Sequence, residues 1–145
     1  MTVPRPRAAG HREIDHTADL GFEVWAPSLA ALFAEAVTAL GEICYDRERV
    51  APAEQRTLQV AGDSHEERLV HWLQEVYFWL ERDLWLTAYV EPVEVTGEVV
   101  RGLFRGERYD PLRHTIHTEI KAITYHQLRV RAEGGLWRTT VIVDV

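Results

Sequence analysis

The chain has 145 residues, of which 46% are hydrophobic and 27% are charged, and its formal net charge at neutral pH is −7. This length accommodates one domain with a real hydrophobic core, and the composition excludes collagen-like, mucin-like and intrinsically disordered classes. No apolar run approaches the roughly 20 residues that a membrane-spanning helix needs. For that reason we expect no membrane partner. An acidic chain has no built-in attraction for phosphate backbones, so we also expect no autonomous nucleic-acid binding.

The first ten residues, MTVPRPRAAG, have no hydrophobic periodicity, and we expect a disordered N-terminal tail over 1–10 followed by one folded domain over 11–145. The sequence shows no charged-then-apolar leader. The single cysteine, Cys44, allows no disulfide within the chain and no thiolate zinc cluster. A cytoplasmic location is therefore the default expectation.

The first predicted helix begins at Ser28, which is a good N-cap residue, and runs to Cys44 or Tyr45. Its apolar residues recur at three- and four-residue steps, namely Leu29, Leu32, Phe33, Ala36, Val37 and Leu40. Before it, residues 22–24 alternate between apolar and polar as in a half-buried strand. After it, residues 56–60 alternate in the same way and predict another strand.

The second predicted helix begins at Gly62-Asp63-Ser64, where we expect Asp63 to be the cap, and it ends near Asp83. Its apolar stripe consists of Leu69, Trp72, Leu73, Val76, Tyr77 and Leu80. Trp79 widens this stripe and predicts a helix that is buried on more than one side.

From residue 84 onward the sequence is rich in β-branched and aromatic residues, punctuated by glycines. Strands are predicted over 85–95, 99–104, 119–125, 128–132 and 136–143. Glu133-Gly134-Gly135 indicates a hairpin turn between the last two. The order of elements predicts an α+β fold, with two helices packed on a largely antiparallel sheet in a single domain.

The seven histidines include two spaced pairs. His65 and His71 lie six residues apart on the second predicted helix and do not face each other. His114 and His117 lie three residues apart in a loop or strand start. Metal binding by either pair is an alternative to the commoner solvated or hydrogen-bonded state. The sequence contains no glycine-rich phosphate loop and no nucleophile elbow.

The segment DHTAD at 15–19 is dense in functional groups and lies between two short apolar stretches. Asp and Thr at such a break are commonly turn formers, and the alternative is a carboxylate site. Hard divalent cations require several oxygen ligands, so this segment would need a second acidic contributor. The C-terminal end is a candidate, since an apolar strand is followed there by Asp144 and Val145. A solvated terminus is the alternative.

Several segments together resemble the archease family over residues 11–145. DHTADLGF and the helix SLAALFAEAVTALGEICYD are similar to the family's N-terminal signature. EIKAITYHQLRV and GGLWRTTVIVDV are similar to its C-terminal signature, and SHEERLVHWLQEVYFWL resembles its second helix. The family has glycine after the histidine of the TYH segment, where this chain has Gln127. If that position needs a positive φ, Gln127 is strained there.

The resemblance implies a single archease-like α+β domain that is a helper protein and not an enzyme. Archeases assist the RtcB-type RNA ligase, which joins RNA ends in tRNA splicing and RNA repair. They activate this ligase by promoting guanylylation of its active-site histidine, which allows multiple turnover. The implied partner is therefore an RNA ligase, and the implied location is the cytoplasm.

The resemblance also implies a divalent-cation site, with Ca²⁺ as the expected metal and Mg²⁺ or Mn²⁺ as alternatives. The family's ligands fall on Asp19, Asp144 and Val145, the last through its main-chain or terminal oxygens. If the first and last strands are neighbours, these groups meet at the strand ends, where a cation would offset the repulsion between carboxylates. Second-tier candidates for the site are Asp15, His16, Asp63 and His126.

Two other function classes remain open on the sequence alone. A metal-dependent hydrolase of a small phosphorylated substrate would use the same carboxylates, with His16 or His126 as general base and a deep pocket beside them. A chaperone-like interaction module would instead expose a large apolar patch, for example around Trp79 or Trp85, and would need no metal.

Overall fold

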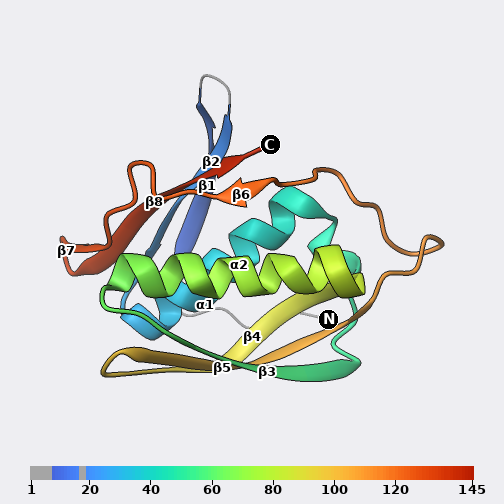
Figure 1. Cartoon of the computed structure of the whole chain (residues 1–145), viewed down its shortest axis with the longest axis horizontal. Helices are drawn as coiled ribbons and strands as arrows, with labels where there is room; N and C mark the ends of the chain where they lie inside the picture. The colour runs from blue at the N-terminus through green and yellow to red at the C-terminus, as the bar shows by residue number, and fades with distance from the viewer. Residues whose placement is uncertain (1–7, 17–18) are drawn as a thin grey trace.

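The computed structural model of the chain describes residues 8–16 and 19–145, without the side chains of Asp15, His16 and Asp19. In this part of the chain, two α-helices lie between two antiparallel sheets, so the fold has three layers (Figure 1). The predicted α+β class, with two helices on antiparallel strands, is confirmed. The strands form two sheets instead of one because helices with apolar surface on more than one side must be covered from both sides.

The first sheet joins the two ends of the described chain. Its strands are β1 (Gly10–His16), β2 (Asp19–Ala26), β6 (Ala122–Ile123), β7 (Arg131–Glu133) and β8 (Leu136–Asp144). The strand order is β1-β2-β8-β6, and β7 also pairs with β8. The last strand of the chain therefore lies beside the second one. Residues 1–7 of the expected tail are outside the described residues.

The second sheet has the order β3-β5-β4, with β3 (Glu54–Ala61), β4 (Trp85–Thr96) and β5 (Val99–Arg108). The side chains of Val100 and Phe104, on the central strand β5, are completely buried. In Figure 1 this sheet forms the lower layer, with both helices above it and the first sheet above the helices.

The first helix, α1 (Leu29–Cys44), lies where the sequence predicts it. Ser28 caps it, because its Oγ accepts a hydrogen bond from the backbone N–H of Ala31 at 3.1 Å. The short 3-10 helix η1 (Arg47–Arg49) follows and leads to β3. Of the described helices, none is both long and apolar enough to cross a membrane.

The second helix, α2 (His65–Asp83), also ends where predicted, but its cap differs. Ser64 is the N-cap, and its Oγ accepts a hydrogen bond from the N–H of Glu67 at 3.0 Å. The expectation that Asp63 caps this helix is therefore wrong. Because α2 begins at His65, the residue directly before it is Ser64 and not Asp63. The side chain in that position reaches the first backbone N–H groups of the helix, which have no partner within the helix.

Aromatic rings fill the space between α2 and the second sheet. The Trp72 ring lies 5.0 Å from the Phe104 ring, and the Trp79 ring lies 5.5 Å from the Trp85 ring, measured between centroids. Trp79 is 7% exposed and Trp85 is 1% exposed. The predicted burial of Trp79 is confirmed, and neither tryptophan forms the exposed apolar patch that a chaperone-like module would need.

The strands predicted over 119–125 and 128–132 are much shorter in the structure, where only β6 and β7 remain. Side chains of α2 take the hydrogen bonds that a neighbouring strand would otherwise take. The hydroxyl of Tyr77 accepts the N–H of Ile120 at 2.8 Å, and the Glu66 carboxylate accepts the N–H of Val130 at 2.7 Å. These contacts give the backbone N–H groups hydrogen-bond partners without strand pairing. Local sequence patterns cannot predict them, because the partners lie far away in the sequence.

Candidate functional site

The two aspartates that the resemblance implicates lie at the same end of neighbouring strands. Asp19 is the first residue of β2, and Asp144 is the last residue of β8. Leu20 pairs with Val143 in the antiparallel β2–β8 ladder, so the next residue on each strand lies beyond the same end of that ladder. Figure 1 shows the C-terminus of the chain at this end, beside β2. The side chain of Asp19 is outside the described residues, so the ligand set itself stays a prediction.

Strand β8 carries Asp144 from the core to the surface. The side chains of Val141, Ile142 and Val143 are all 0% exposed. Asp144 is exposed, and Val145 is 38% exposed. The carbonyl of Asp144 accepts a hydrogen bond from the N–H of Lys121 at 2.7 Å, which ties the strand end to the segment before β6. The Asp144 carboxylate is thus attached to a well-anchored backbone.

The end of β1 comes to the same place. In the β1–β2 ladder, Asp15 pairs with Leu20 and His16 pairs with Asp19. The side chains of Asp15 and His16 are outside the described residues, so their role as second-tier ligands also stays a prediction. Among the residues that the structure describes, no group of three or more His, Cys, Asp or Glu is arranged to hold a metal ion. A cation site here therefore requires Asp19 or its neighbours in 15–18.

Asp63, another second-tier candidate, lies far from this end. The ring of His65, two residues later, packs edge-on against Trp137 with centroids 5.6 Å apart. Trp137 is the second residue of β8, and Asp144 is the last. Seven residues of extended strand span roughly 23 Å, since each adds about 3.3 Å. Asp63 therefore lies near the opposite end of β8 and is not brought together with Asp144.

The turn after the TYH segment has the geometry that the family's glycine suggests. The N–H of Leu128 donates to the carbonyl of Tyr125 at 3.1 Å, which closes a four-residue turn. Gln127 occupies its third position with a φ of 58°. A positive φ at the third position but not at the second is the pattern of a type II turn and favours glycine. The condition under which strain is expected at Gln127, a positive φ, is therefore met.

His126 lies on this turn, at the edge of the first sheet. The backbone N–H and the hydroxyl of Thr124 both donate to the carbonyl of Ile142, at 3.0 Å and 2.8 Å. The N–H of His126 in turn donates to the Thr124 hydroxyl at 3.2 Å. The turn is therefore attached beside Ile142, two residues before Asp144. His126 is exposed, and its role as a second-tier candidate stays a prediction.

His114 has a structural role that the spacing of His114 and His117 did not reveal. It is 4% exposed. Its Nδ1 accepts the N–H of Asp110 at 2.9 Å, and its Nε2 lies 2.9 Å from Oε2 of Glu107. This pattern places the proton of a neutral ring on Nε2, and both nitrogens are engaged. His114 therefore offers no free nitrogen to a metal.

Glu107 organises the loop that contains His114. Its carboxylate accepts hydrogen bonds from the guanidinium of Arg113 and from the N–H of Ala51, the latter at 2.7 Å. The Arg113 guanidinium first, and then the Ala51 amide and His114, lower the pKa of Glu107 to about 2, against the opposing effect of burial. Glu107 is therefore ionised throughout the physiological range and fastens the loop to the end of η1.

A further ionic cluster, which no sequence motif indicates, joins β1 to α1. His11, near the start of β1, places Nδ1 at 2.5 Å from Oε2 of Glu35 and Nε2 at 2.7 Å from Oε1 of Glu42. Glu35 is 1% exposed. Hydrogen bonds to Glu35 and then Glu42 raise the pKa of His11 to about 9, although burial opposes the shift. The one available signal was Glu35 itself, a charged residue within the apolar surface of α1.

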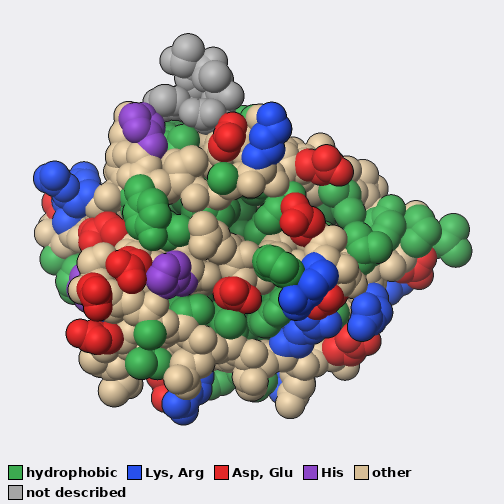
Figure 2. All heavy atoms as spheres, viewed as in Figure 1, with side chains coloured by type: hydrophobic (Ala, Val, Ile, Leu, Met, Phe, Trp, Pro, Cys, Tyr) green, Lys and Arg blue, Asp and Glu red, His purple; other side chains and the backbone are tan. Residues whose placement is uncertain are grey.

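The negative charge of the chain is not confined to the end of β8. Figure 2 shows acidic side chains spread over the visible face, with basic ones between them. What distinguishes the β8 end is that the backbones of two aspartates, Asp19 and Asp144, reach it on adjacent strands. Carboxylate oxygens suit hard cations such as Ca²⁺ and Mg²⁺.

Comparison with known proteins identifies close relatives over nearly the whole chain. Residues 11–145 match the model of the Archease protein family (MTH1598/TM1083). The chain is 42% identical over 136 residues to a protein archease of Methanopyrus kandleri, covering 92% of this chain and 97% of that protein. It is 33% identical over 136 residues to a protein archease of Methanosarcina mazei, covering 91% and 93% of the two chains.

Solved structures show the same fold. Protein 1598 of Methanobacterium thermoautotrophicum, solved in solution, superposes with a TM-score of 0.78 at 27% identity, covering 94% of this chain and 99% of that one. A crystal structure from Thermotoga maritima, described as an archease and possible chaperone, gives a TM-score of 0.65 at 24% identity, covering 92% and 96%. Sequence and fold agree, and this chain belongs to the archease family.

Proposed function

We propose that this protein is a protein cofactor of an RtcB-type RNA ligase in the cytoplasm, where that ligase acts in tRNA splicing and RNA repair. In this proposal it promotes guanylylation of the ligase histidine and multiple turnover, and it carries out no chemistry of its own. Membership of the archease family supports the proposal. The observation that carries it is the β2–β8 register, which puts the backbones of Asp19 and Asp144 at one end of the first sheet.

The donor set at this end fits a hard divalent cation. Asp19 and Asp144 would supply carboxylates, and Val145 would supply main-chain or terminal oxygens, with Asp15 and His16 close by in the β1–β2 ladder. Ca²⁺ is the proposed metal, with Mg²⁺ or Mn²⁺ as alternatives. A bound cation would offset the repulsion between the carboxylates and would offer coordination to phosphate oxygens.

The chain's own residues supply a rigid acidic end. The three buried residues before Asp144 anchor the strand, and the hydrogen bond from Lys121 fixes its last carbonyl. An exposed acidic end on a chain of net charge −7 is complementary to a basic, RNA-binding enzyme. By binding the ligase and not the RNA, an acidic protein would act in RNA processing without any affinity for RNA of its own.

Joining of RNA ends by the cognate ligase tests the proposal. With substrate in excess, the wild-type protein is expected to convert a single round of ligation into many rounds. Asp19→Ala and Asp144→Ala should lose this stimulation while retaining the circular dichroism spectrum of the fold. Asp63→Ala is the matched control, because it removes an exposed carboxylate near the opposite end of β8, and it should stimulate normally. Full stimulation by both Asp19→Ala and Asp144→Ala would exclude the proposed site.

A further inference from the structure

The second sheet has one long, regular edge, which is β3. This strand pairs with β5 over all eight of its residues and has no strand on its other side among the described residues. Its sequence, EQRTLQVA, contains no proline and no lysine, two of the devices with which proteins block an edge. Its one basic residue, Arg56, lies on the α2 side of the strand and is paired with Asp83 at 2.7 Å. An edge of this kind presents unpaired backbone donors and acceptors to any extended segment that approaches it.

The hydrogen-bond pattern identifies the backbone groups that point outward. In an antiparallel pair, alternate residues direct both their N–H and C=O groups toward the partner strand. The N–H of Gly62 points toward the β5 side, since it donates to the carbonyl of Glu98 at 3.2 Å. The carbonyl of Ala61 points the other way and accepts from Nδ1 of His71 at 2.8 Å. By this alternation, Thr57 and Gln59 direct their N–H and C=O groups to the free edge.

The opposite edge of the same sheet, on β4, is blocked. The Tyr45 hydroxyl accepts the N–H of Thr87 at 2.9 Å and donates to its carbonyl at 2.8 Å. The guanidinium of Arg47 donates to the carbonyl of Ala88 at 3.2 Å. Further along, Pro92 and two irregularities interrupt the strand. The contrast shows that the openness of β3 is not a general feature of this sheet.

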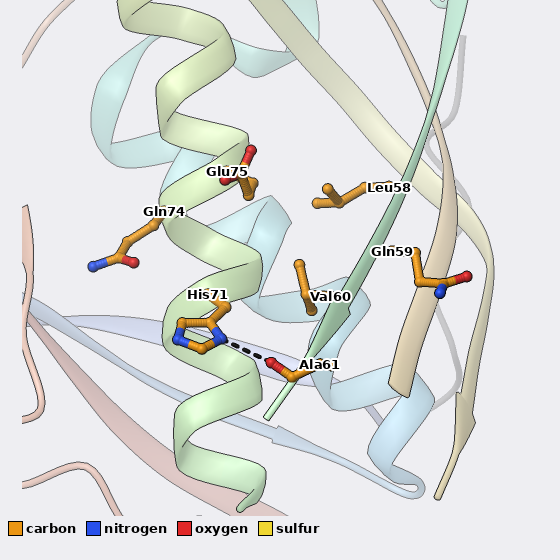
Figure 3. Close-up of a pocket in the computed structure, with 7 residues that line it drawn as sticks. All are labelled: Leu58, Gln59, Val60, Ala61, His71, Gln74 and Glu75. Carbon is orange, nitrogen blue, oxygen red and sulfur yellow. Dashed lines mark hydrogen bonds between the residues drawn. The ribbon is translucent and has the colours of Figure 1, made fainter. Parts of the chain in front are cut away.

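A groove runs beside the open edge, between β3 and α2. It encloses about 430 Å³ and is lined by Leu58, Gln59, Val60, Ala61, His71, Gln74 and Glu75. Figure 3 shows Leu58 and Val60 pointing toward α2, Gln59 pointing away from the helix, and the hydrogen bond from His71 closing one end. One helical turn beyond Glu75, Phe78 is 44% exposed and adds apolar surface to the same flank of α2.

We propose that this edge binds an extended segment of a partner protein, which adds to β3 as a fourth strand of the second sheet. Backbone groups of Thr57 and Gln59 would pair with the segment, and its alternate side chains would lie in the groove against Leu58 and Val60. The Ala61 carbonyl already accepts a hydrogen bond from His71, so the pairing between β3 and the added segment would end there. This surface is separate from the end of β8, and the proposal does not depend on the ligase.

Charge specifies the segment further. Glu75 is exposed beside the groove and forms no direct ion pair with a described residue, although it interacts with Arg82 at longer range, so the segment should have Lys or Arg at the position facing it. A second copy of this chain is a poorer occupant. Antiparallel pairing of β3 with itself would bring α2 of one copy beside α2 of the other, each with an acidic Glu75 at the groove. A strand with one basic residue facing Glu75 and apolar residues facing Leu58 and Val60 suits both the charge and the groove.

A capped hexapeptide in which Val, Val and Lys alternate with Thr is a suitable probe. Added to the ¹⁵N-labelled full chain, it should shift the amide signals of Thr57 and Gln59 and slow their hydrogen exchange. A peptide N-methylated on the edge-facing amides should bind at least about tenfold more weakly, because hydrogen bonds are lost. Glu in place of Lys should weaken binding about two- to fivefold, as for an exposed ion pair.

Protein variants provide the complementary test. Gln59→Pro removes one outward N–H without touching the ladder to β5, and it should reduce peptide binding about tenfold. Gln59→Ala is the matched control and should bind as the wild type does. Should Gln59→Pro fail to fold, the N-methylated peptide gives the same information. Equal binding of the N-methylated peptide, shifts that avoid β3, or self-association of the chain through β3 would each overturn the proposal.

Discussion

The cluster of His11, Glu35 and Glu42 makes the stability of the fold depend on pH in a calculable way. Each ring nitrogen of His11 faces a carboxylate oxygen, at 2.5 Å and 2.7 Å, and Arg47 lies 3.8 Å from Glu42 on the far side. The pKa of His11 is raised from 6.5 to about 9. At about 1.4 kcal/mol for each pKa unit, protonation of the folded form contributes at most about 3.5 kcal/mol.

The sign of the effect follows from the raised pKa. The contribution is fully present below pH 6.5, where the ring is charged even in the unfolded chain, and it is lost as pH rises from 6.5 through about 9. His11→Gln removes the titrating group and, with it, the ion pair between His11 and the buried Glu35. Urea denaturation at pH 6 and at pH 9.5 should therefore show a large stability difference between wild type and variant at pH 6. The difference should be much smaller at pH 9.5. A difference that does not change with pH would refute the assignment of a protonated His11 bridge.

Three further substitutions, and one control substitution, test other features of the fold. Gln127→Gly should raise the free energy of unfolding by about 1 kcal/mol in thermal or urea denaturation, because glycine relieves the positive φ at that turn. Glu107→Gln should lower it by about 2–3 kcal/mol at pH 7, and the loss should shrink as pH falls from 4.5 toward 2, where the wild-type carboxylate is also neutralised. Ser64→Ala should cost about 1 kcal/mol by removing the cap of α2, whereas Asp63→Ala should leave the melting temperature nearly unchanged.

Local patterns in the sequence predicted the helices well because each helix carries its own signals. The apolar periodicity of α1 and α2 and the serines at 28 and 64 lie within the elements that they define. The positive φ at Gln127 was also foreseeable, since a glycine is expected at that point of the family pattern. Assigning the cap to Asp63 was an error of one residue, which is within the usual uncertainty of helix ends.

The features that the sequence did not reveal depend on contacts between distant residues. Tyr77 and Glu66 take the backbone hydrogen bonds of 119–132, and this shortens the predicted strands. His11 finds Glu35 only once β1 lies beside α1. The proximity of Asp19 and Asp144 could be expected only on the condition that the first and last strands are neighbours, and the β2–β8 ladder fulfils that condition.

The most direct test of the proposed function measures the covalent step on the ligase. The RtcB-type ligase is incubated with labelled GTP, and formation of the ligase–GMP adduct is followed after a first round of ligation. We expect the wild-type protein and Asp63→Ala to restore the adduct rapidly, and Asp144→Ala to leave it at the level seen without the protein. Equal restoration by Asp144→Ala and wild type would contradict the claim that the end of β8 carries the activity.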